Sequence, residues 1–441
     1  MIDRVSVVGL GKLGLCLAAC FAHKGIRTIG VDVLPGVVDA INAGTNPLVE
    51  PRMDELIRKL SGNMLQATLD HAEALEKTDI TFILTATPSN PDGSFSNHHI
   101  EAALTSLALA FRENEKNHHT FVISSTVIPE SIANSFIPLI ERESGRKLHD
   151  DFDVCYDPDF VALGNVVHDF LNPDLVIIGE SRPGAGDPVE AVHRKICEGT
   201  PHIARMPLVN AEIAKVSLNA YITMKISFAN TIANLCERIP GADTDAVTEA
   251  IGSDRRISPY YFRGGLSFGG TCFPRDTRAF SSLATRYGLE PLLMNAVERV
   301  NILQDQLLSA IVLSEIERTS RSVVGILGLS FKPKTPVITE SPAVKLIHTL
   351  LENNVQIVVY DPLAKDAVRS LFRDRISYAA SIKACLAASS ICVIANPDEL
   401  YRDAVHSFQP SAPLTVVDCW RNLNGNKLST LYRHRKLGRA D

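Results

Sequence analysis

The sequence predicts an α/β protein made of two doubly wound Rossmann-like domains joined by a long central helix. Three observations lead to this prediction. Short, continuously apolar segments alternate with helical segments, a pattern typical of parallel sheets covered on both faces. A glycine fingerprint follows the first apolar segment, and a second alternating pattern starts at residue 323. Between these two patterns, residues 209–236 are predicted to form one uninterrupted helix.

The first half opens with a predicted strand at residues 5–8, then Gly9-Leu10-Gly11-Lys12-Leu13-Gly14 and an apolar helix at 15–24. In such a fingerprint the first glycine makes the turn and the second admits a pyrophosphate. The third lets helix and strand pack closely. The next strand, 28–32, ends on Asp32, which would accept hydrogen bonds from a ribose and repel a 2′-phosphate. We therefore expect NAD rather than NADP.

Polar residues follow two further predicted strands, at 80–85 and 121–125. Thr87-Pro88-Ser89 comes after the first and Ser125-Thr126-Val127 ends the second. Ligands of open α/β sheets bind beyond the carboxyl ends of the strands. Ordinary turn chemistry is the alternative, but the placement at successive strand ends favours a role in cofactor binding.

Within the long helix, Lys215 and Asn219 are four residues apart and share one face. A lysine is costly to bury without a partner. From the spacing alone, a solvated edge of the helix is slightly favoured over a functional site.

The second half repeats the alternation with predicted strands at 323–328, 356–361, 391–394 and 414–418. We predict an NAD-binding domain at 1–200, a central helical dimerisation domain at 201–300 and a second Rossmann-like domain at 301–441. The basic run 433–439 is interpreted as a solvated tail.

Cys272 lies at the end of a glycine-rich approach, Gly264-Gly265-Leu266-Ser267-Phe268-Gly269-Gly270-Thr271, with Asp276 four residues further on. A buried structural thiol is the commoner fate of a cysteine. So much glycine is expensive in a packed core, however, and useful where backbone approaches a ligand. Together with the nucleotide fingerprint, this suggests a dehydrogenase that works through a covalent thiol adduct.

Composition excludes several other classes. The chain has 441 residues and a net charge of −6, which argues against a nucleic-acid partner. Its nine cysteines form no CxxC pair, so we expect neither a metal site nor a disulfide framework, and Cys16 and Cys20 are expected to be buried thiols. The histidines at 98–99 and 118–119 are expected to be exposed. We expect no signal peptide, no membrane span and a cytoplasmic location.

The ordered set of motifs resembles the nucleotide-sugar dehydrogenases, the group of UDP-glucose 6-dehydrogenase, GDP-mannose dehydrogenase and the UDP-N-acetylhexosamine dehydrogenases. The resemblance covers nearly the full length. The matching segments are Gly9–Gly14 with Asp32, Asn42–Gly44 with Pro47, Thr87-Pro88 with Asp92–Ser94, Ser125–Val127, Asp157–Phe160, Phe170–Asp174, Glu212–Lys215 with Asn219, Phe268–Asp276, Phe331-Lys332, Ser341-Pro342 and Tyr360–Pro362.

The resemblance implies a four-electron oxidation of a sugar C6 alcohol to a uronate with two NAD+, by way of a Cys272 thiohemiacetal and thioester. It implies that Lys215 and Asn219 stabilise the developing oxyanion and that Asp276 and Thr126 position the hydrolytic water. It also implies that Asp159 takes part in the acid/base steps. The implied cofactor residues are Gly9, Gly11, Lys12, Leu13, Gly14, Asp32, Thr87, Pro88 and Thr126. The implied substrate residues are Phe160, Val161, Ala162, Lys215, Asn219, Arg256, Tyr261, Phe268, Gly269, Lys332 and Arg421, with Arg256 lent across a homodimer or higher homo-oligomer.

The sequence departs from the family pattern in three places. Asp159 is one methylene shorter than the family glutamate, and Leu163 stands where a second acid is usual. After Phe331-Lys332, the usual acids and arginine are replaced by Lys334, Val337 and Thr339. The arginine normally helps to hold the cofactor. We interpret the chain as an active but divergent member.

Three interpretations follow. The first is a UDP-sugar 6-dehydrogenase with UDP-glucose as first candidate, because residues 160–162 look more like that group than the N-acetyl group; GDP-mannose and UDP-N-acetylhexosamines are the other substrates. The second is a two-electron dehydrogenase of the 6-phosphogluconate type, which leaves the Cys272 loop unexplained. The third is a degenerate, non-catalytic paralogue that binds a sugar nucleotide; retention of Cys272, Lys215 and Asp276 argues against it.

Overall fold

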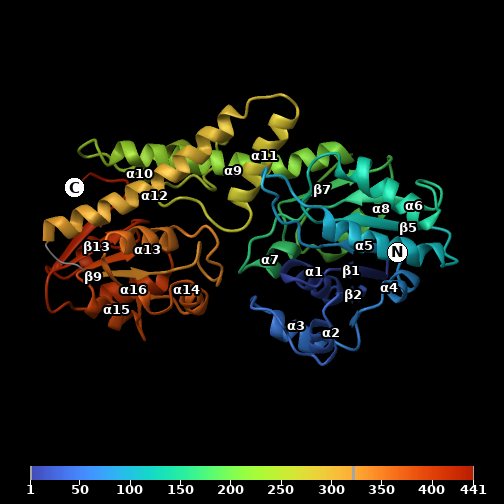
Figure 1. Ribbon diagram of the computed structural model, residues 1–441, viewed down its shortest axis with the longest axis horizontal. Coiled ribbons are helices and arrows are strands. Elements are labelled where there is room, and N and C mark those ends of the chain that lie inside the picture. Colours follow the sequence, from blue (N-terminus) through green and yellow to red (C-terminus); the bar gives the residue numbers. More distant parts are fainter. Residues whose placement is uncertain (1, 320–322, 441) are drawn as a thin grey trace. The chain divides into compact units, whose positions relative to one another are not determined.

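The computed structural model describes residues 2–319 and 323–440 and divides the chain into two compact units, Met1–Ser217 and Leu218–Asp441. Each unit contains one sheet with helices beside it (Figure 1). Helix α9, Leu208–Cys236, runs through the boundary and links the units. The predicted fold class, two Rossmann-like domains joined by a long helix, is confirmed.

Within residues 2–217, the sheet has eight strands in the order β3-β2-β1-β4-β5-β6-β7-β8. All neighbours pair in parallel except β6 and β7, which are antiparallel. The strands are β1 Arg4–Val8, β2 Arg27–Val31, β3 Leu65–Thr68, β4 Ile80–Ile83, β5 His119–Ile123, β6 Phe152–Tyr156, β7 Leu175–Glu180 and β8 His202–Pro207. The helices are α1 Lys12–His23, α2 Pro35–Asn42, α3 Met53–Leu60, α4 His71–Lys77, α5 His98–Arg112, α6 Ile137–Ser144 after a π turn at Ile132–Phe136, α7 Val166–Leu171 and α8 Asp187–Ile196.

Among residues 218–319 and 323–440, the second sheet has six strands, all paired in parallel, in the order β11-β10-β9-β12-β13-β14. The strands are β9 Val323–Leu327, β10 Gln356–Tyr360, β11 Ser377–Tyr378, β12 Ile391–Ile394, β13 Leu414–Asp418 and β14 Tyr432–Lys436. The helices are α10 Thr244–Gly252, α11 Phe273–Arg286, α12 Leu292–Thr319, α13 Pro342–Glu352, α14 Lys365–Phe372, α15 Ile382–Ala388 and α16 Glu399–Ser407, with 3₁₀ turns at Arg373–Arg375 and Gly425–Lys427.

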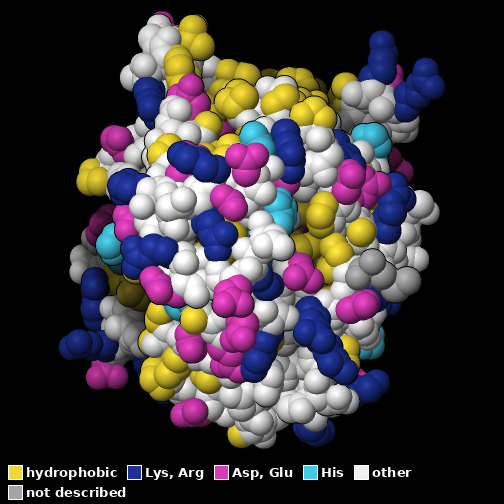
Figure 2. All heavy atoms as spheres, turned by 90° about the vertical axis from the view of Figure 1, so that its right-hand side faces the viewer, with side chains coloured by type: hydrophobic (Ala, Val, Ile, Leu, Met, Phe, Trp, Pro, Cys, Tyr) yellow, Lys and Arg dark blue, Asp and Glu magenta, His cyan; other side chains and the backbone are white. Residues whose placement is uncertain are grey.

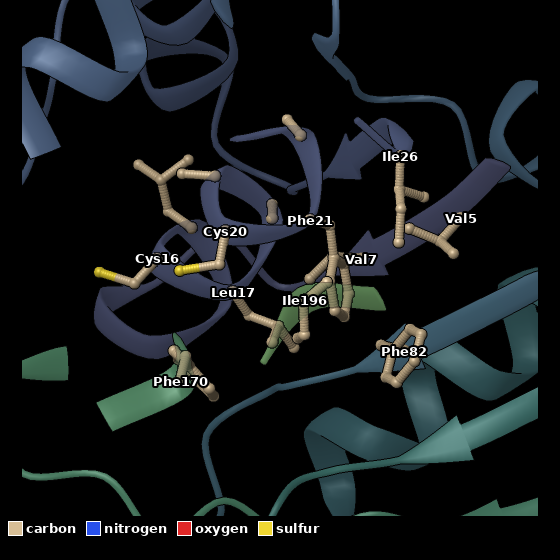
Figure 3. Close-up of a cluster of buried hydrophobic side chains, with 14 of the residues drawn as sticks. Val5, Val7, Cys16, Leu17, Cys20, Phe21, Ile26, Phe82, Phe170 and Ile196 are labelled. Atoms are coloured by element: carbon tan, nitrogen blue, oxygen red, sulfur yellow. The ribbon is translucent and has the colours of Figure 1, made fainter. Parts of the chain in front are cut away.

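The core of the first unit forms where α1 packs on the sheet (Figure 3). Phe21 of α1 lies 4.9 Å from Phe82 of β4, ring centre to ring centre. Cys16 and Cys20 are fully buried on α1. Burial raises the pKa of the Cys20 thiol to about 12 and that of Cys16 further still. The prediction that these cysteines are buried thiols is confirmed.

Two predictions that lie outside the candidate site are wrong. His119 is not exposed: it belongs to β5, is fully buried, and its Nε2 lies 2.8 Å from Oγ1 of Thr81. Burial lowers the pKa of His119 to about 3, so it is a neutral core residue. The basic run 433–439 is not a free tail, because residues 432–436 form strand β14, and Arg435 and Arg439 pair with Glu237 and Asp243.

Other differences concern element ends. Helix α1 begins at Lys12, three residues before the predicted start at Leu15, because the fingerprint glycines Gly11 and Gly14 cap and enter the helix rather than precede it. None of the helices within the described ranges combines the length and apolar character that a bilayer crossing requires. On the face drawn in Figure 2, Lys and Arg side chains are interspersed with Asp and Glu.

Candidate active site

The turn between β1 and α1 has the geometry of a dinucleotide site. Gly9 has a φ of +94°, and a Cβ on Gly14 would lie 1.8 Å from the carbonyl oxygen of Gly9. Both positions therefore need glycine. A Cβ on Gly11, the residue that caps α1, would meet nothing within 4 Å, so this side of the turn is open for a pyrophosphate.

Asp32 is fixed at the end of β2 for ribose binding. Its Oδ2 accepts a 2.8 Å hydrogen bond from the amide of Leu10, and its Oδ1 accepts one of 3.0 Å from the amide of Leu34. The side chain is half-buried, so lone pairs remain accessible. Lys12 and Leu13 lie in the first turn of α1. These residues fit NAD.

Replacement of Gly14 by alanine is expected to abolish NAD binding and to destabilise the first unit. The new Cβ would lie 1.8 Å from backbone, which cannot yield as a flexible side chain would. Calorimetric titration with NAD+ measures the loss. The control is Gly36→Ala on α2, where a Cβ would meet nothing within 4 Å. Tight NAD+ binding by the Gly14→Ala protein would contradict this account of the turn.

The two polar segments predicted after β4 and β5 lie at one edge of the sheet, because these strands are parallel neighbours. Ser125 links them by donating a 2.7 Å hydrogen bond to the carbonyl oxygen of Thr85. Thr87 is buried, Pro88 is exposed and Thr126 is half-buried. The glycine turn after β1 lies at the same edge, because β1 is the parallel neighbour of β4.

Lys215 is buried, so the solvated edge that spacing alone slightly favoured is wrong. Its Nζ donates to the main-chain carbonyl of Asp159 and lies 4.5 Å from the centre of the Phe160 ring. A carbonyl and a π face both favour a cation. Lys215 thus holds the segment at 159–160 that the sequence implied for acid/base chemistry and substrate binding.

Asp159 lies in a charged and poorly solvated environment. Burial and the nearby carboxylate of Asp157 raise its pKa to about 8, against the opposing effect of Lys215 and His193. Asp157 is itself ion-paired, because Nε2 of His193 lies 3.0 and 2.9 Å from its two carboxylate oxygens. An acid with such a pKa is suited to exchanging a proton at neutral pH.

Hydrogen bonds from main-chain amides fix the segment at 162–166, which follows Asp159. The amide of Ala162 donates to Oδ2 of Asp169 at 2.9 Å. The amides of Gly164 and Val166 donate to the two carboxylate oxygens of Glu50, each at 2.9 Å. Val161 and Leu163, on either side of Ala162, pack against the core of the first unit. Glu50 is thus a site residue that the sequence reasoning missed, since it comes from a remote loop.

Cys272 is the exposed thiol among the nine cysteines, all of which lie in described residues. It caps the N-terminus of α11, and its Sγ lies 3.6 Å from Oγ1 of Thr271. The N-terminus of a helix favours negative charge, including that of a thiolate. The alternative of a buried structural cysteine is therefore excluded, and the thiol is available for chemistry.

The glycines before Cys272 are required by this chain's own groups. A Cβ on Gly264 or Gly265 would lie 2.7 Å from the Ala229 carbonyl or the Trp420 ring. On Gly269 it would lie 2.3 Å from the Glu340 carbonyl, and on Gly270 2.6 Å from the Phe331 ring. The glycines therefore let the loop pack closely within the second unit, a reason that the sequence did not indicate.

Asp276 is buried below Cys272 in the first turn of α11. Its Oδ2 accepts a 2.6 Å hydrogen bond from Nδ2 of Asn219, and its Oδ1 accepts one of 2.9 Å from Nε of Arg275. The carboxylate is thus held in one orientation, with further lone pairs for a water. Asn219 and Asp276, predicted to act in the same reaction, are brought together.

The remaining predicted substrate residues lie in several settings. Phe268 is buried and Tyr261 is exposed, and the ring of each forms a T-shaped pair with the ring of Phe273. Arg256 is exposed and pairs with Asp254 at 2.6 Å. Lys332 lies 5.9 Å from the Phe331 ring.

The side chain of Arg421 is buried and makes its contacts within the second unit. Its Nε and Nη2 donate to the two oxygens of Asp245, at 2.8 and 2.9 Å. It also donates to the carbonyls of Leu437 and Gly264, at 2.8 and 2.6 Å. This arrangement ties the Cys272 loop to the second sheet.

The position of the missing family arginine has cations nearby. Thr339 is exposed, and its neighbour Glu340 pairs with Lys345 at 2.9 Å and with Arg278 at 3.3 Å. The carbonyl of Thr339 accepts a 2.9 Å hydrogen bond from the amide of Gly270, next to the Cys272 loop. Both cations, however, are already paired with Glu340.

Comparisons with known proteins agree with this geometry. The NAD binding, central and UDP binding domains of the UDP-glucose/GDP-mannose dehydrogenase family match residues 3–197, 209–302 and 325–424. A UDP-glucose 6-dehydrogenase of Haloferax volcanii is 34% identical over 417 residues, covering 94% of this chain and 96% of the relative. A GDP-mannose 6-dehydrogenase of Pseudomonas aeruginosa is 32% identical, covering 91% and 93%.

Among solved structures, a UDP-glucose dehydrogenase from Pyrobaculum islandicum superposes with a TM-score of 0.89 at 32% identity, covering 100% of this chain and 98% of that one. The chain belongs to the UDP-glucose/GDP-mannose dehydrogenase family. It is an NAD-dependent nucleotide-sugar 6-dehydrogenase.

Proposed function

We propose that this chain oxidises UDP-glucose to UDP-glucuronate through a covalent adduct on Cys272. The observation that carries the proposal is the exposed thiol at the N-terminus of α11, in a unit whose Asn219 and Asp276 are hydrogen-bonded to each other. The 34% identity to a UDP-glucose 6-dehydrogenase and the character of residues 160–162 support UDP-glucose. GDP-mannose is the second candidate, because relatives named for it are 32% identical.

The proposed chemistry balances as follows. The C6 alcohol loses two electrons to become an aldehyde, and the Cys272 thiolate adds to it. The thiohemiacetal loses two more electrons to give a thioester, which water cleaves to the carboxylate and the free thiol. Bound NAD+ supplies the oxidant for each oxidation. The sum consumes one water and two NAD+ and yields two NADH and three protons.

We assign the roles by chemistry. The Lys215 ammonium and the Asn219 amide stabilise the oxyanion that develops at C6. Asp276, held by Asn219 and Arg275, orients the hydrolytic water together with Thr126. Asp159 exchanges a proton with the reacting oxygen, for which its raised pKa suits it. In this proposal the sugar nucleotide contacts Phe160–Ala162, Tyr261, Phe268, Gly269 and Lys332.

The proposal extends to organisation. We divide the chain into functional parts at 1–200, 201–300 and 301–441, supported by the three matched family segments. We propose a homodimer in the cytoplasm, with Arg256 reaching the partner's substrate. Exposed Tyr221, Phe228 and Leu235 recur every seven residues on α9 and so form an apolar stripe suited to a partner helix. Light scattering of the purified protein tests the dimer.

The test is NADH formation with UDP-glucose, UDP-galactose, UDP-N-acetylglucosamine, UDP-N-acetylmannosamine and GDP-mannose, with the product masses. Two NADH per UDP-glucuronate from UDP-glucose alone is the expected result. Two NADH from another sugar nucleotide would reassign the substrate. One NADH per substrate would indicate a two-electron dehydrogenase, and binding of sugar nucleotide without any NADH would indicate a non-catalytic protein.

Substitution of Asp159 by glutamate is expected to keep or raise kcat, because the longer side chain restores the family's reach to the substrate. A displacement of about 1 Å can change a rate roughly 100-fold. Steady-state kinetics on the preferred substrate measures the effect. The comparison is Asp159→Asn, which keeps the shorter length but cannot exchange the proton and should lose activity. A large fall in Asp159→Glu would show that the surroundings have been rebuilt around aspartate.

A further inference from the structure

A buried ion pair lies beside Asp159 at the end of β6. His193 comes from α8 and Asp157 directly follows β6, and the two side chains are only 11% and 7% exposed. Burial alone would lower the pKa of His193, but the Asp157 carboxylate outweighs it and raises that pKa to about 10. His193 is therefore positively charged at neutral pH and lies against the side chain of Asp157. A buried pair of this kind is weak evidence for stability, which invites a functional explanation.

Asp159 experiences the charges of this pair. Among the described residues, none offers a hydrogen-bonding partner to its buried Oδ2. The charged groups that face Asp159 are Asp157 on its own segment, His193 on α8 and Lys215 on α9. Cys197, at the end of α8, also faces His193. Lys215 Nζ donates to the main-chain carbonyl of Asp159, and its charge opposes the rise in the pKa of the Asp159 carboxyl group.

We propose that the Asp157–His193 pair is a positioning device that keeps Asp159 protonated, so that Asp159 presents an O–H donor to the substrate. Two neighbouring buried carboxyl groups cannot both ionise easily. His193 decides which of them does: its charge and its two short contacts hold Asp157 as the carboxylate. The remaining proton then stays on Asp159. The catalytic meaning rests on the proposed function, but the protonation itself does not.

Infrared spectroscopy of the resting protein tests the protonation directly. The carbonyl band of a carboxylic acid, assigned to Asp159 by its loss in Asp159→Asn, is followed from about pH 5 to about pH 10. In the parent protein the band should be present at neutral pH and disappear in the alkaline range. In Asp157→Asn, which keeps a hydrogen bond to His193 but removes the charge, the midpoint should fall by about one pH unit or more.

The matched control is Asp153→Asn. Asp153 lies within β6, which ends one residue before Asp157, is equally buried, and pairs with Arg182 at 2.8 Å instead of His193. Its replacement should leave the Asp159 midpoint unchanged. His193→Gln serves as a second variant, because it removes a positive charge. The last proton shared by the two carboxyl groups should then dissociate at a higher pH than in the parent protein. The two variants thus shift the midpoint in opposite directions, which a merely structural pair would not do.

Kinetics supply the second readout. The pH limb of kcat/KM that Asp159 controls should move to lower pH in Asp157→Asn and stay in place in Asp153→Asn. Absence of a protonated Asp159 at neutral pH, or an unchanged midpoint in Asp157→Asn, would overturn the inference. If every sugar nucleotide fails as a substrate while the infrared shifts occur, the proposed function is wrong and the pairing stands.

Discussion

Replacement of Cys272 by serine is expected to stop uronate formation, with a fall in the rate of at least about 1,000-fold. A serine hydroxyl is ionised far less readily than a thiol and cannot form a thioester. The first oxidation does not need the sulfur. The variant is therefore expected to release the aldehyde or to complete only a slow single turnover. Product masses and NADH stoichiometry measure both steps.

A matched control is Cys236→Ser, because Cys236 is a buried thiol near the end of α9 and has no part in the proposed chemistry. It should retain two NADH per substrate. Thiol alkylation gives a second check, since Cys272 is exposed and the other cysteines are buried or half-buried. Unchanged turnover in Cys272→Ser would sink the covalent mechanism and leave a conventional pair of hydride transfers through a hydrated aldehyde.

Replacement of Lys215 by methionine is expected to lower kcat by roughly 100- to 1,000-fold, the usual cost of losing a donor that stabilises an oxyanion. Methionine approximates the length of lysine but removes the charge. It also leaves the carbonyl of Asp159 without its donor and removes the cation from the Phe160 ring. KM should therefore rise as well, because Phe160 belongs to the proposed substrate segment.

The comparison for Lys215→Met is Lys24→Met. Lys24 lies just after α1 and pairs with Glu198 at 2.8 Å on the surface, an interaction worth little. Its loss should leave kcat unchanged. Removal of the Lys215 charge should also move the Asp159 limb of the pH profile to higher pH, because that cation lowers the pKa of Asp159. A Lys215→Met protein with parental kcat would refute the oxyanion role.

The fold and the cofactor turn were predictable because both depend on short-range patterns. Apolar runs located β12 and β13 to the residue, and the glycine spacing located the turn from Gly9 to Gly14. The basic composition of residues 432–436 hid β14, since an edge strand paired on one side needs no apolar run. His119 was missed because its partner, Thr81, comes from a neighbouring strand.

The candidate site was predictable only in part. Cys272, Asn219 and Asp276 stand in motifs with the residues around them, so their identities could be read from the sequence. The burial of Lys215 could not, because its partners at 159–160 lie 55 or more residues away in the chain. Glu50 and His193 carry no local pattern at all. Their importance arises from the carboxyl end of β6, where distant segments meet.

Helix α9 has a practical consequence for recombining this chain with its relatives. The boundary between the compact units falls after Ser217, inside a helix of 29 residues, and so separates Lys215 from Asn219 within a single turn of backbone. A chimera joined there would fuse helix faces that were selected in different proteins. Exchange of substrate preference should therefore transfer Leu208–Cys236 as one piece, with crossover points in the flanking strand and loop.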